Sequence, residues 1–74
     1  MRLSHAEINK KYKITALYGG RMFQHRILAL GLYIGEIIEI DRKAPFKGPL
    51  LIKIDSSTVA IGHNIAHKID VQEI

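Results

Sequence analysis

The sequence predicts a small, mainly β protein in which about five short strands form a barrel or sandwich and one helix packs against it. Two observations support this fold class. Short runs of alternating apolar and polar residues recur along the 74-residue chain with turn-forming residues between them. Residues 21–30 contain no glycine or proline and have apolar residues at helical spacing. Closure into a barrel would also remove the exposed strand edges that promote aggregation.

The N-terminal residues have the pattern of a helix start. Ser4 is the expected N-cap, and Glu7 lies three residues later, where it would complete a capping box. Leu3 and Ile8 occupy the positions of a hydrophobic staple. We therefore expect a short helical turn at Ser4, followed by a strand over residues 12–17.

The predicted helix over residues 21–30 has an apolar face formed by four residues: Phe23, Ile27, Leu28 and Leu30. Gly31 follows at the position where helices commonly end in a left-handed residue, a conformation that costs other residues about 1–2 kcal/mol. Gly35 lies just before the next strand, and a reversal this tight commonly needs a second residue with positive φ. Both glycines are thus expected to have positive φ.

The second half of the chain reads as strands joined by short connections. A loop with both prolines, "KAPFKGP", follows the first of these strands, and "DSS" and "GHNIAH" are expected to form a turn and a single helical turn. The expected strands cover residues 36–42, 50–55, 58–61 and 68–74.

Composition limits the class of protein. The length fits a single domain, residues 1–74, and the absence of cysteine excludes disulfides and cysteine-ligated metal centres. No apolar stretch approaches the roughly 20 residues of a membrane span, and the N-terminus lacks the apolar core of a secretion signal. We therefore expect a cytoplasmic protein. Its net charge of +4 favours an anionic partner.

The order of "LGLYIG", "APFKGPLLIKI" and "AIGHNIAHKIDV" resembles the FeoA family, small cytoplasmic proteins of bacterial ferrous iron uptake. The resemblance covers essentially the whole chain. The matching positions are Arg26, Ile27, Leu28, Leu30, Gly31, Leu32, Gly35, Ala44, Pro45, Pro49, Ala66, Ile69 and Val71. In the proline loop, Lys47 and Gly48 replace a frequent Gly-Asp order, so that a basic group stands in place of an acidic one.

This resemblance implies an SH3-like β-barrel and a partner, the FeoB-type ferrous iron permease with its cytosolic GTPase region. The expected function is a non-enzymatic accessory protein that binds the cytosolic part of this permease and modulates its assembly or activity. The same fold occurs in iron-dependent repressors, but no helix-turn-helix precedes it here, so a repressor is not expected. No cofactor and no nucleic acid are expected, and a homo-oligomer is compatible with this interpretation.

The predicted contact patch for the permease has an apolar centre and a basic rim, as many protein interfaces do. Its residues are Arg26, Leu32, Tyr33, Pro45, Phe46 and Lys47. For Leu32 the alternative is that it fills the barrel interior.

Other function classes are less well supported. No serine lies in a strained Gly-x-Ser-x-Gly turn, so an enzyme is not expected. His63 and His67 lie four residues apart and could bind a divalent metal, but a tight site needs three or more ligands. His5 and His25 have no partner at ligand spacing. The alternatives left open are a basic nucleic-acid-binding barrel and a metal-responsive module.

Overall fold

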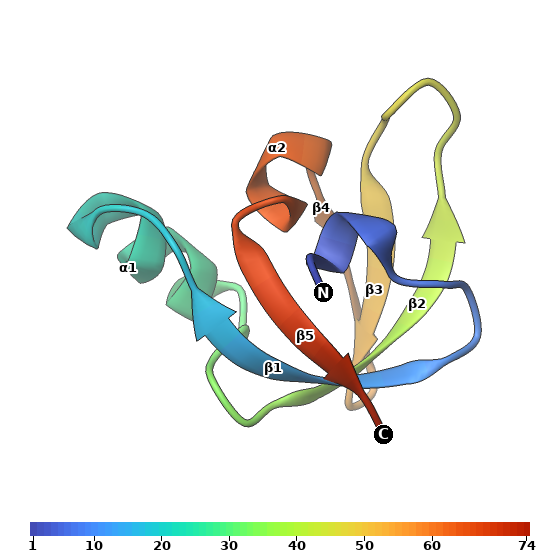
Figure 1. The fold of residues 1–74 in the computed structure, drawn as a ribbon, viewed down its shortest axis with the longest axis horizontal. Helices are drawn as coiled ribbons and strands as arrows, with labels where there is room; N and C mark the ends of the chain where they lie inside the picture. Colours follow the sequence, from blue (N-terminus) through green and yellow to red (C-terminus); the bar gives the residue numbers. More distant parts are fainter.

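A computed structural model describes all residues, 1–74, and contains five strands, two α-helices and one 3-10 turn (Figure 1). In chain order the elements are η1 (Leu3–His5), β1 (Lys11–Leu17), α1 (Arg21–Ala29), β2 (Ile37–Lys43), β3 (Leu50–Ile54), β4 (Ser57–Ile61), α2 (His63–Ala66) and β5 (Ile69–Glu73). The predicted five strands and the predicted helix are confirmed, with boundaries that differ by at most one residue.

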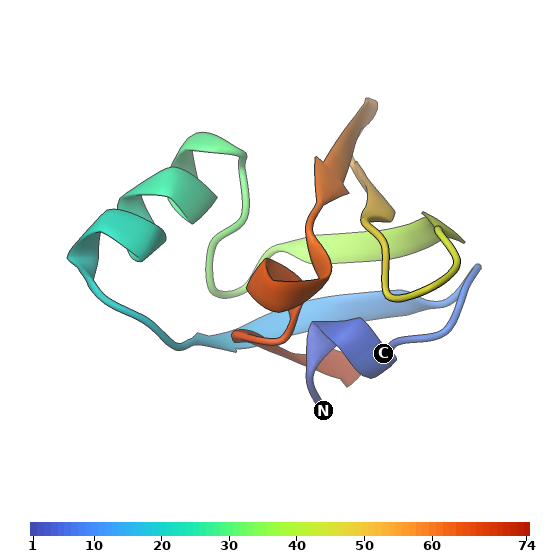
Figure 2. The same ribbon diagram turned by 90° about the horizontal axis from the view of Figure 1, so that it is seen from above.

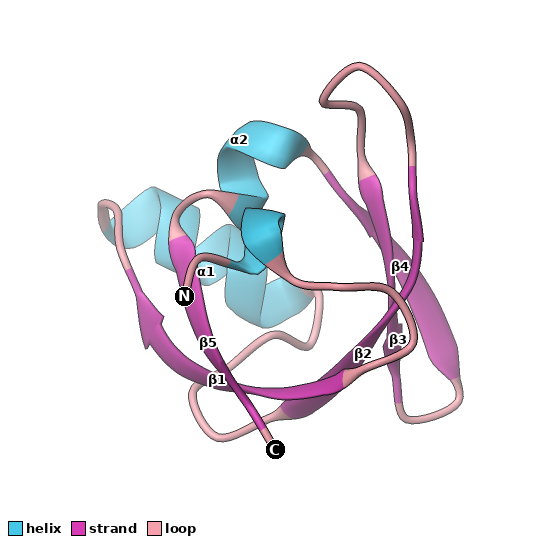
Figure 3. Cartoon of the chain, turned by 45° about the vertical axis from the view of Figure 1, so that its right-hand side comes forward, coloured by secondary structure: helices cyan, strands magenta, loops and turns pink.

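The strands form one antiparallel sheet in the order β4-β3-β2-β1-β5, which curls into a small SH3-like barrel (Figure 3). Two irregularities help it to curl. The β1–β5 register shifts between Ile14 and Ala16, and the β2–β3 register shifts between Ile40 and Arg42. Such bulges bend a strand and increase its twist. The sheet can therefore enclose a core although it has few strands.

Alternating side chains of the strands point inward and form one apolar core. Residues of the turns and helices complete it, because the strands alone would leave the ends of the barrel open. The buried core consists of Leu3, Ala6, Tyr12, Ile14, Ile27, Leu32, Ile38, Ile40, Leu50, Ile52, Ile54, Ile61, Ala66, Ile69 and Val71.

The N-terminal segment covers the outer edge of β5. The Met1 amino group donates a hydrogen bond to the Val71 carbonyl at 3.0 Å, and the Val71 N–H donates to the Met1 carbonyl at 2.7 Å. Arg2 forms an isolated bridge with Asp70. These bonds satisfy backbone groups that an exposed edge would leave unpaired.

The capping box predicted for the N-terminal turn is wrong. The turn spans Leu3–His5 with Arg2 as its N-cap and has no side-chain capping bond. Ser4 is buried instead, with its hydroxyl oxygen 3.2 Å from Nδ1 of His67, and Ile8 is exposed. A contact between distant parts of the chain thus replaces the local motif.

Helix α1 ends as the sequence predicts. Gly31 has φ of 88°, its N–H donates to the Leu28 carbonyl, and the Leu32 N–H donates to the Ile27 carbonyl. This pair of bonds is a Schellman motif, which places Ile27 and Leu32 together in the core. Gly35 has φ of 97° and lies in a turn closed by a bond from the Glu36 N–H to the Tyr33 carbonyl.

The predicted apolar face of α1 is only partly confirmed. Ile27 is fully buried and Phe23 is half-buried, but Leu28 and Leu30 are exposed. Helix α1 lies beside the barrel rather than across it, so that one side of the helix is covered (Figure 2). No helix has the length or apolar character needed to cross a bilayer.

Candidate interaction surfaces

The structure places one serine beside a histidine, but this pair is not arranged for catalysis. The hydroxyl group of Ser4 is 3.2 Å from Nδ1 of His67, while Ser4 itself is only 7% exposed. A nucleophile must be reachable by its substrate, and its base is normally oriented by a third group. The contact instead joins η1 to α2.

Three histidines from two distant parts of the sequence lie close together. The ring centres of His5 and His67 are 6.1 Å apart, and those of His63 and His67 are 6.5 Å apart. The fold brings η1 against α2, and His5 stays exposed. The structure contains no group of three or more His, Cys, Asp or Glu side chains arranged to hold a metal ion.

One shallow depression of about 390 Å³ lies where β2 begins and β3 ends. Charged groups of both signs line it, and only two of the lining residues are apolar: the set is Lys11, Glu36, Ile37, Ile38, Glu39, Lys53 and Asp55. Ligand pockets are usually enclosed and mostly apolar. The depression does not have the character of a small-molecule site.

The six residues predicted to form one contact patch are divided by the fold into three locations. Leu32 has no exposed surface and fills the barrel, as its alternative interpretation proposed. Arg26 and Tyr33 lie exposed in α1 and the segment that follows it. Pro45, Phe46 and Lys47 lie in the β2–β3 loop, on the opposite side of the molecule from α1 (Figures 1 and 2). The patch is therefore not continuous.

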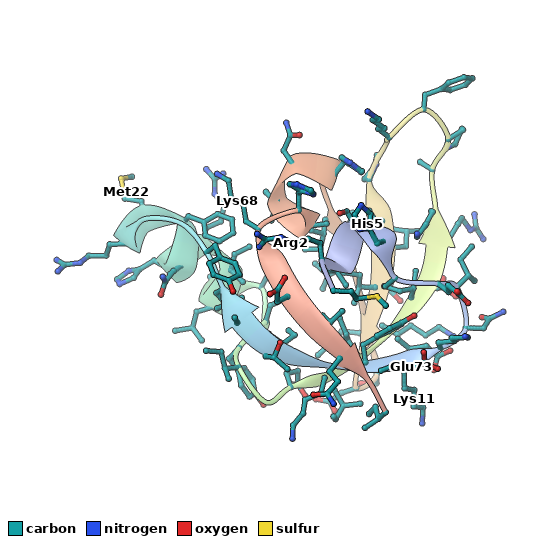
Figure 4. All side chains as sticks on the ribbon, in the orientation of Figure 1. Arg2, His5, Lys11, Met22, Lys68 and Glu73 are labelled. Atoms are coloured by element: carbon teal, nitrogen blue, oxygen red, sulfur yellow. The ribbon has the colours of Figure 1, made fainter.

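The exposed residues of α1 and of the segment that joins it to β2 form what we call the helix surface. Its apolar members are Met22, Leu28, Leu30, Tyr33 and Ile34, and its basic members are Arg21 and Arg26. Met22, which is 87% exposed, points away from the barrel (Figure 4). No acidic residue occurs between Glu7 and Glu36, and neither arginine forms an ion pair. The helix surface is thus both apolar and basic.

Two contacts beside the helix surface connect it to the barrel. The Lys68 ammonium lies 5.2 Å from the ring centre of Phe23, the half-buried aromatic of α1. At the edge of the surface, the Glu36 carboxylate raises the pKa of Tyr33, first as a hydrogen-bond acceptor and then as a nearby negative charge.

The loop between β2 and β3, residues 44–49, forms what we call the hairpin tip. The Ala44 N–H donates to the Pro49 carbonyl at 3.0 Å, and the Gly48 N–H donates to the Pro45 carbonyl at 3.1 Å. The central residues of this turn, Phe46 and Lys47, have φ of 58° and 57°. Positive φ at both central positions is the type I′ geometry, which normally selects Asn and Gly.

The contact residues predicted from the sequence include Arg26, Tyr33 and the hairpin-tip residues, and that prediction remains untested. They do not include Met22, Leu28 and Ile34, which the structure shows to be exposed. A helical pattern of apolar residues usually marks the face toward the core, so Leu28 was assigned to that face. Met22 was the one residue whose position indicated an exposed apolar side chain, because it does not lie on the helix face that Phe23 and Ile27 form.

Solved structures with the same fold include both small iron-transport proteins and larger repressors. A crystal structure titled iron uptake regulatory protein (FeoA) has 24% identity, a TM-score of 0.93, and coverage of 100% of this chain and 97% of its own. Iron(II) transport protein A from Clostridium thermocellum has 27% identity, a TM-score of 0.90, and coverage of 100% and 46%. A manganese-dependent transcriptional repressor has 17% identity, a TM-score of 0.91, and coverage of 100% and 36%.

These matches define the class: the chain is a small SH3-like barrel protein with a helix beside the barrel. The family model described as FeoA domain matches residues 1–73. The chain therefore belongs to the FeoA family, small accessory proteins with a role in ferrous iron transport. No match is found among curated proteins.

Proposed function

We propose that this protein is a non-enzymatic, cytoplasmic accessory protein that binds the cytosolic part of a FeoB-type ferrous iron permease and modulates its assembly or activity. Membership of the FeoA family supports the role in ferrous iron transport. The observation that carries the binding proposal is the helix surface, where α1 and the segment that follows it expose several apolar side chains and two arginines without ion pairs.

The chemistry of the helix surface indicates the kind of region it would contact. Contiguous exposed apolar side chains are uncommon on proteins that work alone and commonly mark protein–protein contacts. Arginine and aromatic residues are the side chains most enriched where binding energy is concentrated. Because the surface has no carboxylate between its arginines, it would fit an apolar patch flanked by acidic residues on the permease.

The helix surface is also held in a defined position. Ile27 and Leu32 attach both ends of the Schellman motif to the core, and the Lys68–Phe23 contact lies at the N-terminal half of α1. A surface that is already ordered loses less conformational freedom on binding. Binding would therefore not require α1 to fold or dock first.

The proposal is tested by calorimetric titration of the protein into the cytosolic region of its permease at about 50 mM and about 200 mM salt. We expect saturable binding that weakens at the higher salt concentration. Arg26→Glu should weaken binding by about tenfold, because it places a like charge against the acidic region of the partner.

Lys13→Glu is the matched control, since Lys13 is an exposed cation of β1 that forms no ion pair. This variant changes the net charge by the same amount but lies outside the helix surface, so it should bind almost normally. Absence of heat at both salt concentrations, or equal loss in the two variants, would contradict the proposal.

A further inference from the structure

We propose that the hairpin tip is a membrane contact: Phe46 inserts its ring into the interface of an anionic phospholipid bilayer while Arg42 and Lys47 contact the headgroups. This inference does not depend on permease binding at the helix surface. It rests on the turn geometry, the exposure of one aromatic ring, and the distribution of charge around it.

The turn geometry is the first observation. Phe46 and Lys47 adopt positive φ at both central positions of a type I′ turn, where residues with a Cβ are strained. Gly48 leaves no room for a larger residue, since a Cβ there would lie 2.7 Å from the Ala44 Cβ. Backbone strain of this kind concentrates where a loop has a binding role.

The exposure of Phe46 is the second observation. Its side chain is 98% exposed, so its ring contributes nothing to the core. The loop that joins β2 to β3 projects beyond the rest of the barrel (Figure 3). Phe46 is a central residue of the strained turn in this loop. A fully exposed ring on a projecting turn gains free energy only when something outside the protein covers it.

The charge distribution is the third observation. No acidic residue occurs between Asp41 and Asp55, whereas Arg42, Lys43 and Lys47 lie in or beside the hairpin tip. Arg42 and Lys47 are exposed and form no ion pair, while the Lys43 ammonium donates to the Ser4 carbonyl at 3.5 Å. The carboxylates of the depression lie at the opposite ends of β2 and β3. The projecting end is therefore cationic.

A bilayer surface fits this combination better than a protein does. A stable protein interface buries about 800 Å² per partner around several anchors, and a six-residue turn with one aromatic ring is too small for that. An aromatic ring at headgroup depth, flanked by lysine and arginine, needs no preformed pocket. Anionic headgroups attract each nearby cation.

The expected contact is weak and reversible. Even a single myristoyl chain binds membranes only marginally, and stable anchoring requires two signals. One aromatic ring and two cations would act as one such signal, so that the protein would accumulate at the membrane surface without remaining there permanently.

The test uses the absence of tryptophan from the chain. Phe46→Trp introduces a single tryptophan at the hairpin tip, and Met22→Trp places one at a similarly exposed position of α1. Each variant is mixed with vesicles of phosphatidylcholine alone or with about 30% phosphatidylglycerol. We expect the tryptophan emission of the Phe46→Trp variant to shift to the blue only with anionic vesicles, and that of the Met22→Trp variant to stay unchanged.

Co-sedimentation gives an independent readout. Phe46→Ser and Lys47→Glu should each lower the bound fraction about fivefold or more at low salt, and Met22→Ser should not. These exposed positions should leave the melting temperature unchanged. Equal emission shifts for both tryptophan variants, equal binding to neutral vesicles, or no binding at about 25 mM salt would overturn the proposal.

Discussion

Single glycines determine how this chain turns from its helix into its sheet. Gly31 and Gly35 both have positive φ, and each supplies a conformation that a residue with a Cβ adopts only at a cost. This was predictable from the sequence because the cost belongs to the backbone and not to the surroundings. The positive φ of Phe46 and Lys47 was not predictable, because these residues normally avoid that conformation.

Gly31→Ala should lower the free energy of unfolding by about 1–2 kcal/mol. No atom lies within 4 Å of the position that the new Cβ would occupy, so the effect comes from the strained φ alone. Gly62→Ala is the control, because its φ of −62° suits alanine and its Cβ position is also open. Urea unfolding should separate the two variants; equal midpoints would show that Gly31 is not strained.

The Tyr33 hydroxyl should titrate at a pH above its ordinary value, because Glu36 favours its neutral form. A folded pKa above the unfolded value means that the stabilising contribution is present below the unfolded pKa and is lost as pH rises through the folded pKa. Alkaline conditions should therefore remove it. Glu36→Ala should lower the pKa of Tyr33, as followed by NMR of the tyrosine ring carbons; an unchanged titration would contradict this.

At the scale of elements, local patterns predicted strands and helix boundaries well but failed where distant segments meet. The alternation of apolar residues identified each strand, because one face of every strand must enter the core. The capping box failed because Ser4 contacts His67, which is 63 residues away in the sequence. Similarly, only one side of α1 is covered by the barrel, so its exposed leucines could not be distinguished from its buried isoleucine by spacing.

Helix α1 should depend on one buried residue and tolerate changes on its outer side. Ile27→Ala removes a fully buried side chain and should destabilise the protein by about 2–5 kcal/mol. Leu28→Ala, at a position that is 59% exposed, should change stability by about 0.5 kcal/mol or less. Thermal unfolding of both variants tests this; similar losses would mean that the two residues are equally buried.

At the scale of the whole molecule, the barrel separates two surfaces that the sequence alone suggested as one. Arg26 and Tyr33 lie on the helix surface, and Phe46 and Lys47 lie at the hairpin tip on the other side. The residue types of a contact surface could be chosen from the sequence, since exposed aromatic and basic residues are typical of such contacts. The sequence could not show which of these residues lie side by side, because their positions depend on how the sheet curls.

This separation would allow the two surfaces to act together. A protein bound to a membrane permease through the helix surface could touch the adjacent bilayer through the hairpin tip, and a second weak contact strengthens the first when both can form at once. Each surface is basic, which is consistent with the net charge of +4.

The most direct test of the central claim is NMR chemical-shift mapping of the isotope-labelled protein with the unlabelled cytosolic region of its permease. We expect resonances of α1 and residues 30–34 to shift or broaden with saturation, and those of the depression formed by Glu39, Lys53 and Asp55 to stay in place. No change at any resonance, or changes confined to that depression, would contradict the claim that the helix surface binds the permease.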